Sequence, residues 1–193
     1  MLKEIKRAPE VELYKSAAYF FNKNGYSSTS VRKICRTIRI RESSVYHYIR
    51  SKETLLFNIC ELAMTVSLDF IAPIAKLDLS PDVKLKRMIE LHTATIAKHS
   101  NEHSTMLKEL RSLNPSNRRK IIKLRDRYEI LFQKIIGDCV HEKIFRDLDF
   151  KIATLLLLGM MNSLIRWYSP EGQIKSESIA EVFSELFFNG VKK

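Results

Sequence analysis

The stretch that decides the fold is residues 29–48, which read TSVRKICRTIRIRESSVYHY. Its first half predicts a short helix over 30–37, because apolar residues recur there at the three- and four-residue spacing of one helical face. These residues are Val31, Ile34, Cys35 and Ile38. Thr29 stands at the start of this helix, where its hydroxyl is expected to cap the first turn.

The second half of the stretch predicts a still shorter helix over 41–47, with Val45 and then Ile49 facing inward. Its outer residues are small, polar or charged, namely Arg41, Glu42, Ser43, Ser44 and His47. Such a helix can enter the major groove of DNA without clashing. Two short helices joined by a tight turn, and braced by a third over 9–24, form a helix-turn-helix.

Basic residues are concentrated around this stretch. The 193 residues include 33 Lys and Arg against 22 Asp and Glu, for a formal net charge of +11. Residues 1–53 alone hold twelve basic and five acidic side chains. A basic excess of this kind favours nucleic acid or an anionic membrane surface as the partner.

The rest of the chain repeats the helical pattern and contains no convincing strand, so the fold class is all-α. The expected helices span 9–24, 30–37, 41–47, 52–75, 81–99, 102–112, 115–141, 149–168 and 175–189. We expect a three-helix DNA-binding domain with the helix-turn-helix over 1–50. A six-helix domain for effector binding and dimerisation is expected over 51–193.

Several features indicate a cytoplasmic protein without a membrane segment. The three cysteines, Cys35, Cys60 and Cys139, form no paired motif and are expected to be reduced packing residues. The N-terminus reads MLKEIKRAPE and has no apolar signal core. The longest apolar run, Ile152–Ile165, is shorter than the roughly 20 residues of a membrane span, so a buried helix is expected.

No motif indicates catalysis or a cofactor. The sequence has no phosphate loop, no glycine-rich nucleotide fingerprint and no nucleophile elbow, so an enzyme is not expected. His92, His99 and His103 would share one face of a continuous helix, but Ser100-Asn101 is expected to break the helix between them. A metal site is therefore not expected either.

The N-terminal part of the chain, over about residues 10–57, resembles the N-terminal domain of TetR-family repressors. The residues that carry the resemblance are Ala17, Ala18, Phe21, Gly25, Tyr26, Thr29, Ser30, Val31, Ile34, Tyr46, His47, Tyr48, Ser51, Lys52, Glu53, Leu55 and Leu56. The resemblance implies that Thr29, Tyr46, His47 and Lys52 hold phosphates. It also implies that Arg41, Ser43 and Ser44 approach bases.

The predicted DNA-binding set is Thr29, Ser30, Arg32, Arg41, Ser43, Ser44, Tyr46, His47 and Lys52. Hydroxyls and a lysine at helix starts can donate hydrogen bonds to phosphate oxygens, and Arg41 can donate two hydrogen bonds to the edge of a guanine. The turn departs from the family pattern, because Arg39 replaces its usual glycine and Arg41 its usual capping serine. Arg39 in a left-handed turn costs about 1 kcal/mol relative to glycine. Glu42 also stands where the family favours a basic or small residue. These departures leave the turn geometry and the base contacts open, but they do not affect the expected fold.

The last two expected helices predict a dimer. The segment 149–168 is apolar on nearly every side, so it must be covered on both sides, and a second copy is the simplest cover. The segment 175–189 carries an apolar face of Ile179, Val182, Phe183, Leu186 and Phe187. The resemblance implies pairing through these two helices, and the alternative is the core helix of a monomer.

A mixture of apolar and polar residues predicts an effector site in the body. Its candidates are Met64, Met88, His92, Met106, Leu110, Tyr128, Met161 and Trp167, for which ordinary core packing is the alternative. The segment Trp167–Ile174 resembles a TetR subgroup that regulates lipid catabolism and often responds to acyl-CoA thioesters. A basic stretch offers either a site for CoA phosphates or a solvated face, and consists of Arg111, Arg118, Arg119, Lys120, Lys123, Arg125 and Arg127.

The sequence thus predicts a homodimeric, ligand-responsive repressor. It would bind a palindromic operator in double-stranded DNA and leave it when a small apolar effector, an acyl-CoA thioester, binds. Two alternatives stay open. One is the same fold sensing another hydrophobic or drug-like molecule, as an efflux regulator does. The other is a basic protein that binds DNA without sequence preference, or binds a membrane surface.

Overall fold

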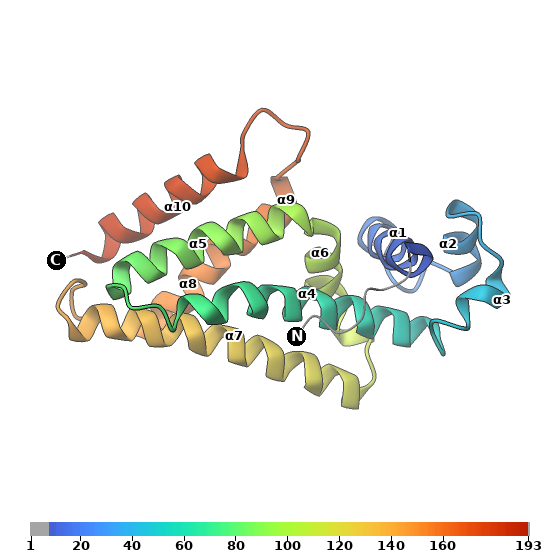
Figure 1. The fold of residues 1–193 in the computed structure, drawn as a ribbon, viewed down its shortest axis with the longest axis horizontal. Coiled ribbons are helices and arrows are strands. Elements are labelled where there is room, and N and C mark those ends of the chain that lie inside the picture. Colours follow the sequence, from blue (N-terminus) through green and yellow to red (C-terminus); the bar gives the residue numbers. More distant parts are fainter. Residues whose placement is uncertain (1–7, 193) are drawn as a thin grey trace. The chain divides into compact units, whose positions relative to one another are not determined.

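The structure is a computed structural model that describes residues 8–192, and its named elements within that range are all helices (Figure 1). They are α1 (Ala8–Asn24), α2 (Val31–Thr37), α3 (Glu42–Val45), α4 (Lys52–Ile74), α5 (Pro81–Lys98), α6 (Ser100–Glu109), the 3₁₀ turn η1 (Leu110–Ser112), α7 (Pro115–His141), α8 (Phe150–Asn162), α9 (Leu164–Trp167) and α10 (Ser176–Val191). The predicted all-α fold is confirmed.

Three helices differ from the expected spans by more than their terminal residues. The expected helix over 102–112 is α-helical from Ser100 to Glu109 and continues as η1, so the break expected at Ser100-Asn101 lies at His99 instead. The segment 149–168 divides at Ser163 into α8 and α9. The expected helix over 41–47 is regular only from Glu42 to Val45. After Val45 the backbone forms a tighter turn, in which the N–H of Tyr48 donates to the carbonyl of Val45, three residues earlier, at 2.8 Å.

The chain divides into two compact units. The first extends to Ala63 and includes Asn101–Ile122, and the second consists of Met64–Ser100 and the chain from Lys123 onward. Helices α4 and α7 each contribute to both units.

The first unit is built around the apolar faces of its three N-terminal helices. Its buried residues include Leu13, Ala17, Ala18 and Phe21 of α1, Val31, Ile34 and Cys35 of α2, and Val45 and Ile49 at α3. Gly25 ends α1 with a positive φ of 82°, and its N–H donates to the carbonyl of Phe21 at 3.0 Å. That left-handed turn redirects the chain into the loop before α2.

The start of α2 corrects one expectation. Ser30, not Thr29, is the N-cap, and its Oγ accepts a hydrogen bond from the backbone N–H of Lys33 at 3.2 Å. The prediction that Thr29 caps this helix is wrong because the Thr29 hydroxyl points the other way. It donates to the carbonyls of Phe20 at 3.2 Å and Gly25 at 2.9 Å.

The end of α2 has the left-handed turn expected at Arg39, where φ is 55°. The N–H of Arg39 bonds the carbonyl of Arg36 at 3.4 Å, and the N–H of Ile40 bonds that of Cys35 at 3.1 Å. This pair of bonds is a Schellman motif, which satisfies the last carbonyls of the helix. The chain therefore keeps the geometry of a glycine turn with an arginine in it.

Hydrogen bonds between distant parts of the chain tie α1 to α6 within the first unit. Asn22 donates to Asn101 at 2.9 Å and accepts from Ser104 at 2.6 Å. The hydroxyl of Thr105 donates to the carbonyl of Ala18 at 3.0 Å. These partners lie 79 to 87 residues apart in the chain, so no local pattern in the sequence indicates them.

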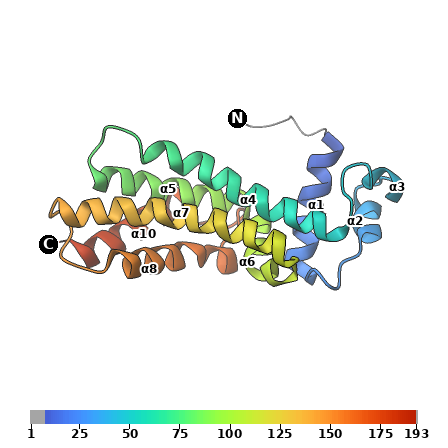
Figure 2. The ribbon, with the colours of Figure 1, turned by 90° about the horizontal axis from the view of Figure 1, so that it is seen from below.

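In the second unit α5 runs beside α10, and α8 also packs against both helices (Figures 1 and 2). The core includes Leu85, Met88 and Ile89 of α5, Tyr128, Phe132 and Ile136 of α7, Leu157 and Met161 of α8, and Ile179 and Phe183 of α10. The last residue of α10 is hydrogen-bonded to the loop after α7, because the N–H of Arg146 donates to the carbonyl of Val191 at 2.9 Å.

An exposed apolar surface covers parts of α8 and α10, which lie on the same side of this unit in Figure 2. Its residues are Phe150, Ile152, Leu155 and Leu156 of α8, and Val182 and Leu186 of α10. Leu156 is 68% exposed and Leu186 is 62% exposed. A groove of about 510 Å³ between the two helices is lined mainly by apolar side chains. Exposed leucines in such numbers indicate a surface that another molecule covers.

Two stretches, Lys52–Ile74 and Phe150–Trp167, are long and apolar enough to cross a membrane. The second stretch extends beyond the apolar run Ile152–Ile165 at both ends, and the expectation that it is a buried helix is wrong for most of its residues. Half of the apolar window of the first stretch and 28% of that of the second are buried. Core helices of soluble proteins meet the same criteria.

Candidate nucleic-acid interface and effector site

A polar cleft lies at the start of α2 and beside α3. It has a volume of about 490 Å³ and is lined by Ser27, Ser28, Thr29, Ser30, Val31, Arg32, Glu42, Tyr46 and Lys52. Five of the nine predicted DNA-binding residues are therefore together here. Ser27 and Ser28 were not predicted, although the run Ser27-Ser28-Thr29-Ser30 is visible in the sequence as four consecutive hydroxyls.

Lys52 fixes the loop that carries these hydroxyls. Its Nζ donates to the carbonyl of Tyr26 at 2.9 Å and to that of Thr29 at 3.1 Å. The same ammonium lies 4.1 Å from the centre of the Tyr26 ring, in cation–π geometry. From the other side, the N–H of Tyr26 donates to the Glu109 carboxylate at 3.0 Å. Hydrogen bonds therefore fix the loop at two backbone carbonyls, those of Tyr26 and Thr29, and at the N–H of Tyr26.

Thr29 is placed differently from the other predicted phosphate contacts. Its side chain is only 1% exposed, and its hydroxyl donates inward to backbone carbonyls. The hydroxyl therefore stabilises the turn between α1 and α2, and burial keeps it from the surface that a phosphate would reach.

The remaining predicted residues lie on or beside α3. Tyr46 is 51% exposed and lines the cleft. Arg41, Ser43 and His47 are exposed and Ser44 is half-buried, and the cleft lining does not include these four. Arg41 is the N-cap of α3 but makes no side-chain capping bond.

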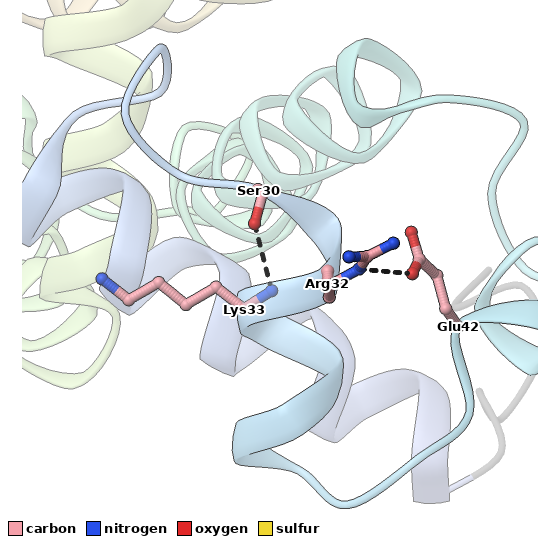
Figure 3. A network of polar contacts seen from close by, with 4 residues as sticks. All are labelled: Ser30, Arg32, Lys33 and Glu42. Atoms are coloured by element: carbon pink, nitrogen blue, oxygen red, sulfur yellow. Dashed lines mark hydrogen bonds and ion pairs between the residues drawn. The ribbon is translucent and has the colours of Figure 1, made fainter.

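An ion pair joins α2 to α3 across this surface. The Nε of Arg32 lies 3.3 Å from the Oε2 of Glu42, and the two side chains point toward each other in Figure 3. Figure 3 also shows Ser30 bonded to the backbone of Lys33 in the first turn of α2. Glu42 is thus bonded to a predicted DNA-binding residue on the neighbouring helix.

The predicted effector residues divide between the two units. Met64, Met88, His92, Tyr128 and Met161 belong to the second unit and are all buried. Met106, which is buried, and Leu110, which is half-buried, belong to the first unit. Trp167 is 51% exposed, and its indole N–H donates to the Ser163 hydroxyl at 3.2 Å.

One polar pair stands within the apolar interior of the second unit. The Nδ1 of His92 and the hydroxyl of Tyr128 are 2.7 Å apart, and both rings contact Phe132. Burial raises the pKa of the Tyr128 hydroxyl above its usual value, so the tyrosine stays neutral. The pair is therefore a buried polar contact between α5 and α7.

The cysteines are buried thiols. Burial raises the pKa of Cys60 and of Cys139 to about 12, and it raises that of Cys35 as well. Such thiols are protonated at neutral pH, as expected for packing residues. Within residues 8–192, no group of three or more His, Cys, Asp or Glu side chains is arranged to hold a metal ion.

Two family models match the chain. Residues 13–59 match the model described as bacterial regulatory proteins, tetR family. Residues 78–191 match the model described as Tetracyclin repressor-like, C-terminal domain. The first match contains the polar cleft, and the second contains the apolar surface of α8 and α10.

Individual relatives agree with these matches over nearly the whole chain. The fatty acid metabolism regulator protein of Bacillus subtilis (strain 168) is 21% identical over 188 residues, which cover 96% of this chain and 97% of that protein. The structure of the TetR family transcriptional regulator PfmR from Thermus thermophilus is 30% identical, with a TM-score of 0.86 over 94% of this chain and 99% of its own. AibR in complex with isovaleryl coenzyme A and operator DNA is 22% identical, with a TM-score of 0.83 over 93% and 97%.

Proposed function

Because the chain belongs to the TetR family of bacterial regulatory proteins, we propose that it is a homodimeric repressor that binds a palindromic operator and leaves it when an acyl-CoA thioester binds. Residues 1–50 read DNA, and residues 51–193 bind the effector and dimerise. The protein acts in the cytoplasm. The families that match are regulators, and none indicates an enzyme.

The polar cleft is the observation that carries the proposal. Hydroxyls of Ser27, Ser28, Ser30 and Tyr46 donate to the oxygens of one DNA strand, together with the remaining N–H of the Lys52 ammonium. Contacts of this kind set the register of α3 on the duplex and carry no base preference. Arg41, Ser43 and Ser44 then approach the base edges, and His47 lies beside them. Thr29 contributes through the turn that it holds, since its hydroxyl is buried.

The exposed apolar surface of α8 and α10 supports a dimer. Phe150, Ile152, Leu155, Leu156, Val182 and Leu186 would be covered by the same residues of a second copy. Twofold symmetry suits DNA recognition, because two α3 helices then read two half-sites of a palindrome. The half-sites would lie about 34–36 Å apart, or a multiple of that distance.

The effector assignment rests on the second unit and on the relatives. Both rings of the His92–Tyr128 pair pack on Phe132, and a hydrogen bond from this pair to a thioester carbonyl would orient an acyl chain in the interior of the second unit. One relative is named a fatty acid metabolism regulator, and another was solved with isovaleryl coenzyme A. Exposed basic residues of α7 in the second unit would receive the CoA phosphates, namely Lys123, Arg125 and Arg127.

DNA recognition is tested by selecting duplexes from a pool with a randomised centre and then by competition in a mobility-shift assay. We expect an enriched palindrome that unrelated DNA displaces poorly. If unrelated DNA competes as well as the palindrome itself, operator recognition is excluded and the protein is a non-specific binder.

Tyr46→Ala tests the phosphate role. Tyr46 is 51% exposed, so the variant should fold normally and lose affinity for every duplex to a similar extent. Tyr19→Ala is the matched control, since Tyr19 lies on α1 with 43% exposure and does not line the cleft. A change of base preference in Tyr46→Ala would contradict the assigned role.

Leu156→Glu and Leu186→Glu test the dimer. Each places a charge in the proposed interface, so sedimentation should show monomers. Leu107→Glu, on α6 with 37% exposure, is the control that should stay dimeric. Dimers of normal stability in both interface variants would refute this use of α8 and α10.

The effector is tested by titrating acyl-CoA thioesters of increasing chain length against the protein–palindrome complex. Free coenzyme A and the matching free fatty acids serve as controls. We expect release by a thioester and not by coenzyme A alone. If no chain length releases the DNA, this effector class is excluded while operator binding stands.

A further inference from the structure

Glu42 is the one acidic residue that lines the polar cleft, as far as the described residues show. It stands in the first turn of α3 and is 39% exposed at its side chain. Every neighbour in the lining that carries charge is a cation, either Arg32 or Lys52. A carboxylate at a surface that receives phosphates needs a specific explanation, because like charges repel.

The pairing with Arg32 reduces that repulsion. The Nε of Arg32 bonds the Oε2 of Glu42 at 3.3 Å, which offsets the negative charge where the DNA backbone would approach. The pair is exposed, with Arg32 70% exposed, so its contribution to stability is small. Its effect is therefore on the placement of the carboxylate rather than on folding.

The paired carboxylate keeps a hydrogen-bonding capacity. A carboxylate accepts through both oxygens, and Arg32 engages Oε2, which leaves Oε1 for a further donor. In the major groove the donors on base edges are the exocyclic amino groups of cytosine and adenine. Glutamate pairs with the single N4 amino group of cytosine, whereas adenine pairs better with an amide side chain that both donates and accepts.

We propose that Glu42, positioned by Arg32, is a specificity-determining residue that accepts a hydrogen bond from the N4 amino group of a cytosine in each half-site. This inference rests on the proposed operator binding and deepens it. Arg32 is the positioning residue. Its guanidinium holds Glu42 through Nε and keeps its terminal N–H groups for the neighbouring phosphate.

The experiment repeats the selection from the randomised duplex pool with the full-length protein and with Glu42→Ala, Glu42→Gln and Arg32→Ala. Glu12→Ala is the matched control, because it removes an exposed carboxylate from α1 in the same unit. Thermal unfolding of each variant establishes that it is folded. Affinities are then measured for the selected duplex and for duplexes changed at single positions.

The native protein should discriminate a C·G pair from the other pairs at one position of each half-site by on the order of 10-fold. Glu42→Ala should lose that preference alone, keep the rest of the motif and bind unrelated DNA more tightly. Glu42→Gln should shift the preference toward adenine. Arg32→Ala should weaken binding to every duplex and reduce the cytosine preference, while Glu12→Ala should match the native protein.

Two results would overturn the inference in different ways. If Glu42→Ala selects the same motif as the native protein at every position, Glu42 does not read bases, and operator binding is unaffected. If the native protein itself enriches no motif, operator binding fails, and the inference fails with it.

Discussion

Arg39→Gly should make the protein more stable, although it removes a charged side chain from a loop. Arg39 has a φ of 55°, in the left-handed region that favours glycine. The Schellman motif around it uses only backbone groups, so both of its hydrogen bonds survive the change. Left-handed geometry costs an ordinary residue about 1–2 kcal/mol, which glycine avoids. Glycine also has greater conformational freedom in the unfolded chain, which lowers the stability of the fold by about 0.5–1 kcal/mol. The expected gain is about 0.5–1 kcal/mol, which raises the melting temperature by about 1–4 °C for a chain of this length.

Circular dichroism at increasing temperature and urea concentration measures this gain. Arg39→Ala is the control that separates backbone strain from charge, because it removes the guanidinium and keeps the Cβ. It should leave the melting temperature nearly unchanged. Lys143, with a φ of 62°, is in the same kind of motif at the end of α7, so Lys143→Gly should also stabilise the protein. The reasoning is refuted if Arg39→Gly lowers the melting temperature, or if Arg39→Ala raises it equally.

Other variants test single contacts. Lys52→Met should weaken binding to all duplexes alike and lower the salt dependence of binding by about one unit of slope, as measured by fluorescence anisotropy. An unchanged slope would mean that Lys52 meets no phosphate. Tyr128→Phe should lower the free energy of unfolding by about 1 kcal/mol in urea, because His92 loses its 2.7 Å hydrogen bond. No loss would show that the bond does not stabilise the fold. Cys60 and Cys139, with pKa values of about 12, should resist alkylation at mildly alkaline pH until the protein is denatured, as followed by mass spectrometry. Rapid labelling of the native protein would contradict their burial.

The helices could be predicted because their signals are local. Apolar spacing placed α2 at 30–37 against the observed Val31–Thr37, and Pro81 and Pro115 begin α5 and α7 as expected from capping residues followed by proline. The left-handed turn at Arg39 was implied by the resemblance, because Arg39 stands where the family has a glycine, and the backbone keeps that geometry.

The effector candidates were harder to predict, because burial alone does not define a site. Met88 and Met161 are fully buried, which ordinary core packing also explains, while Trp167 is half-exposed. The pair of His92 and Tyr128 joins residues 36 positions apart on different helices. The sequence shows that each residue has a polar group that can lie within a core, but only the packing of the helices brings the two side chains together.

The sequence by itself determined the helical spans, the helix-turn-helix and the concentration of positive charge around it, since spacing, capping and composition act within a few residues. Tertiary structure decided which way each side chain faces. It turned Thr29 inward and Ser30 outward, although both are hydroxyls next to each other in the chain. It also joined Arg32 to Glu42 across two helices. Such contacts depend on how the helices pack, and the spacing of residues along one helix carries no information about its neighbour.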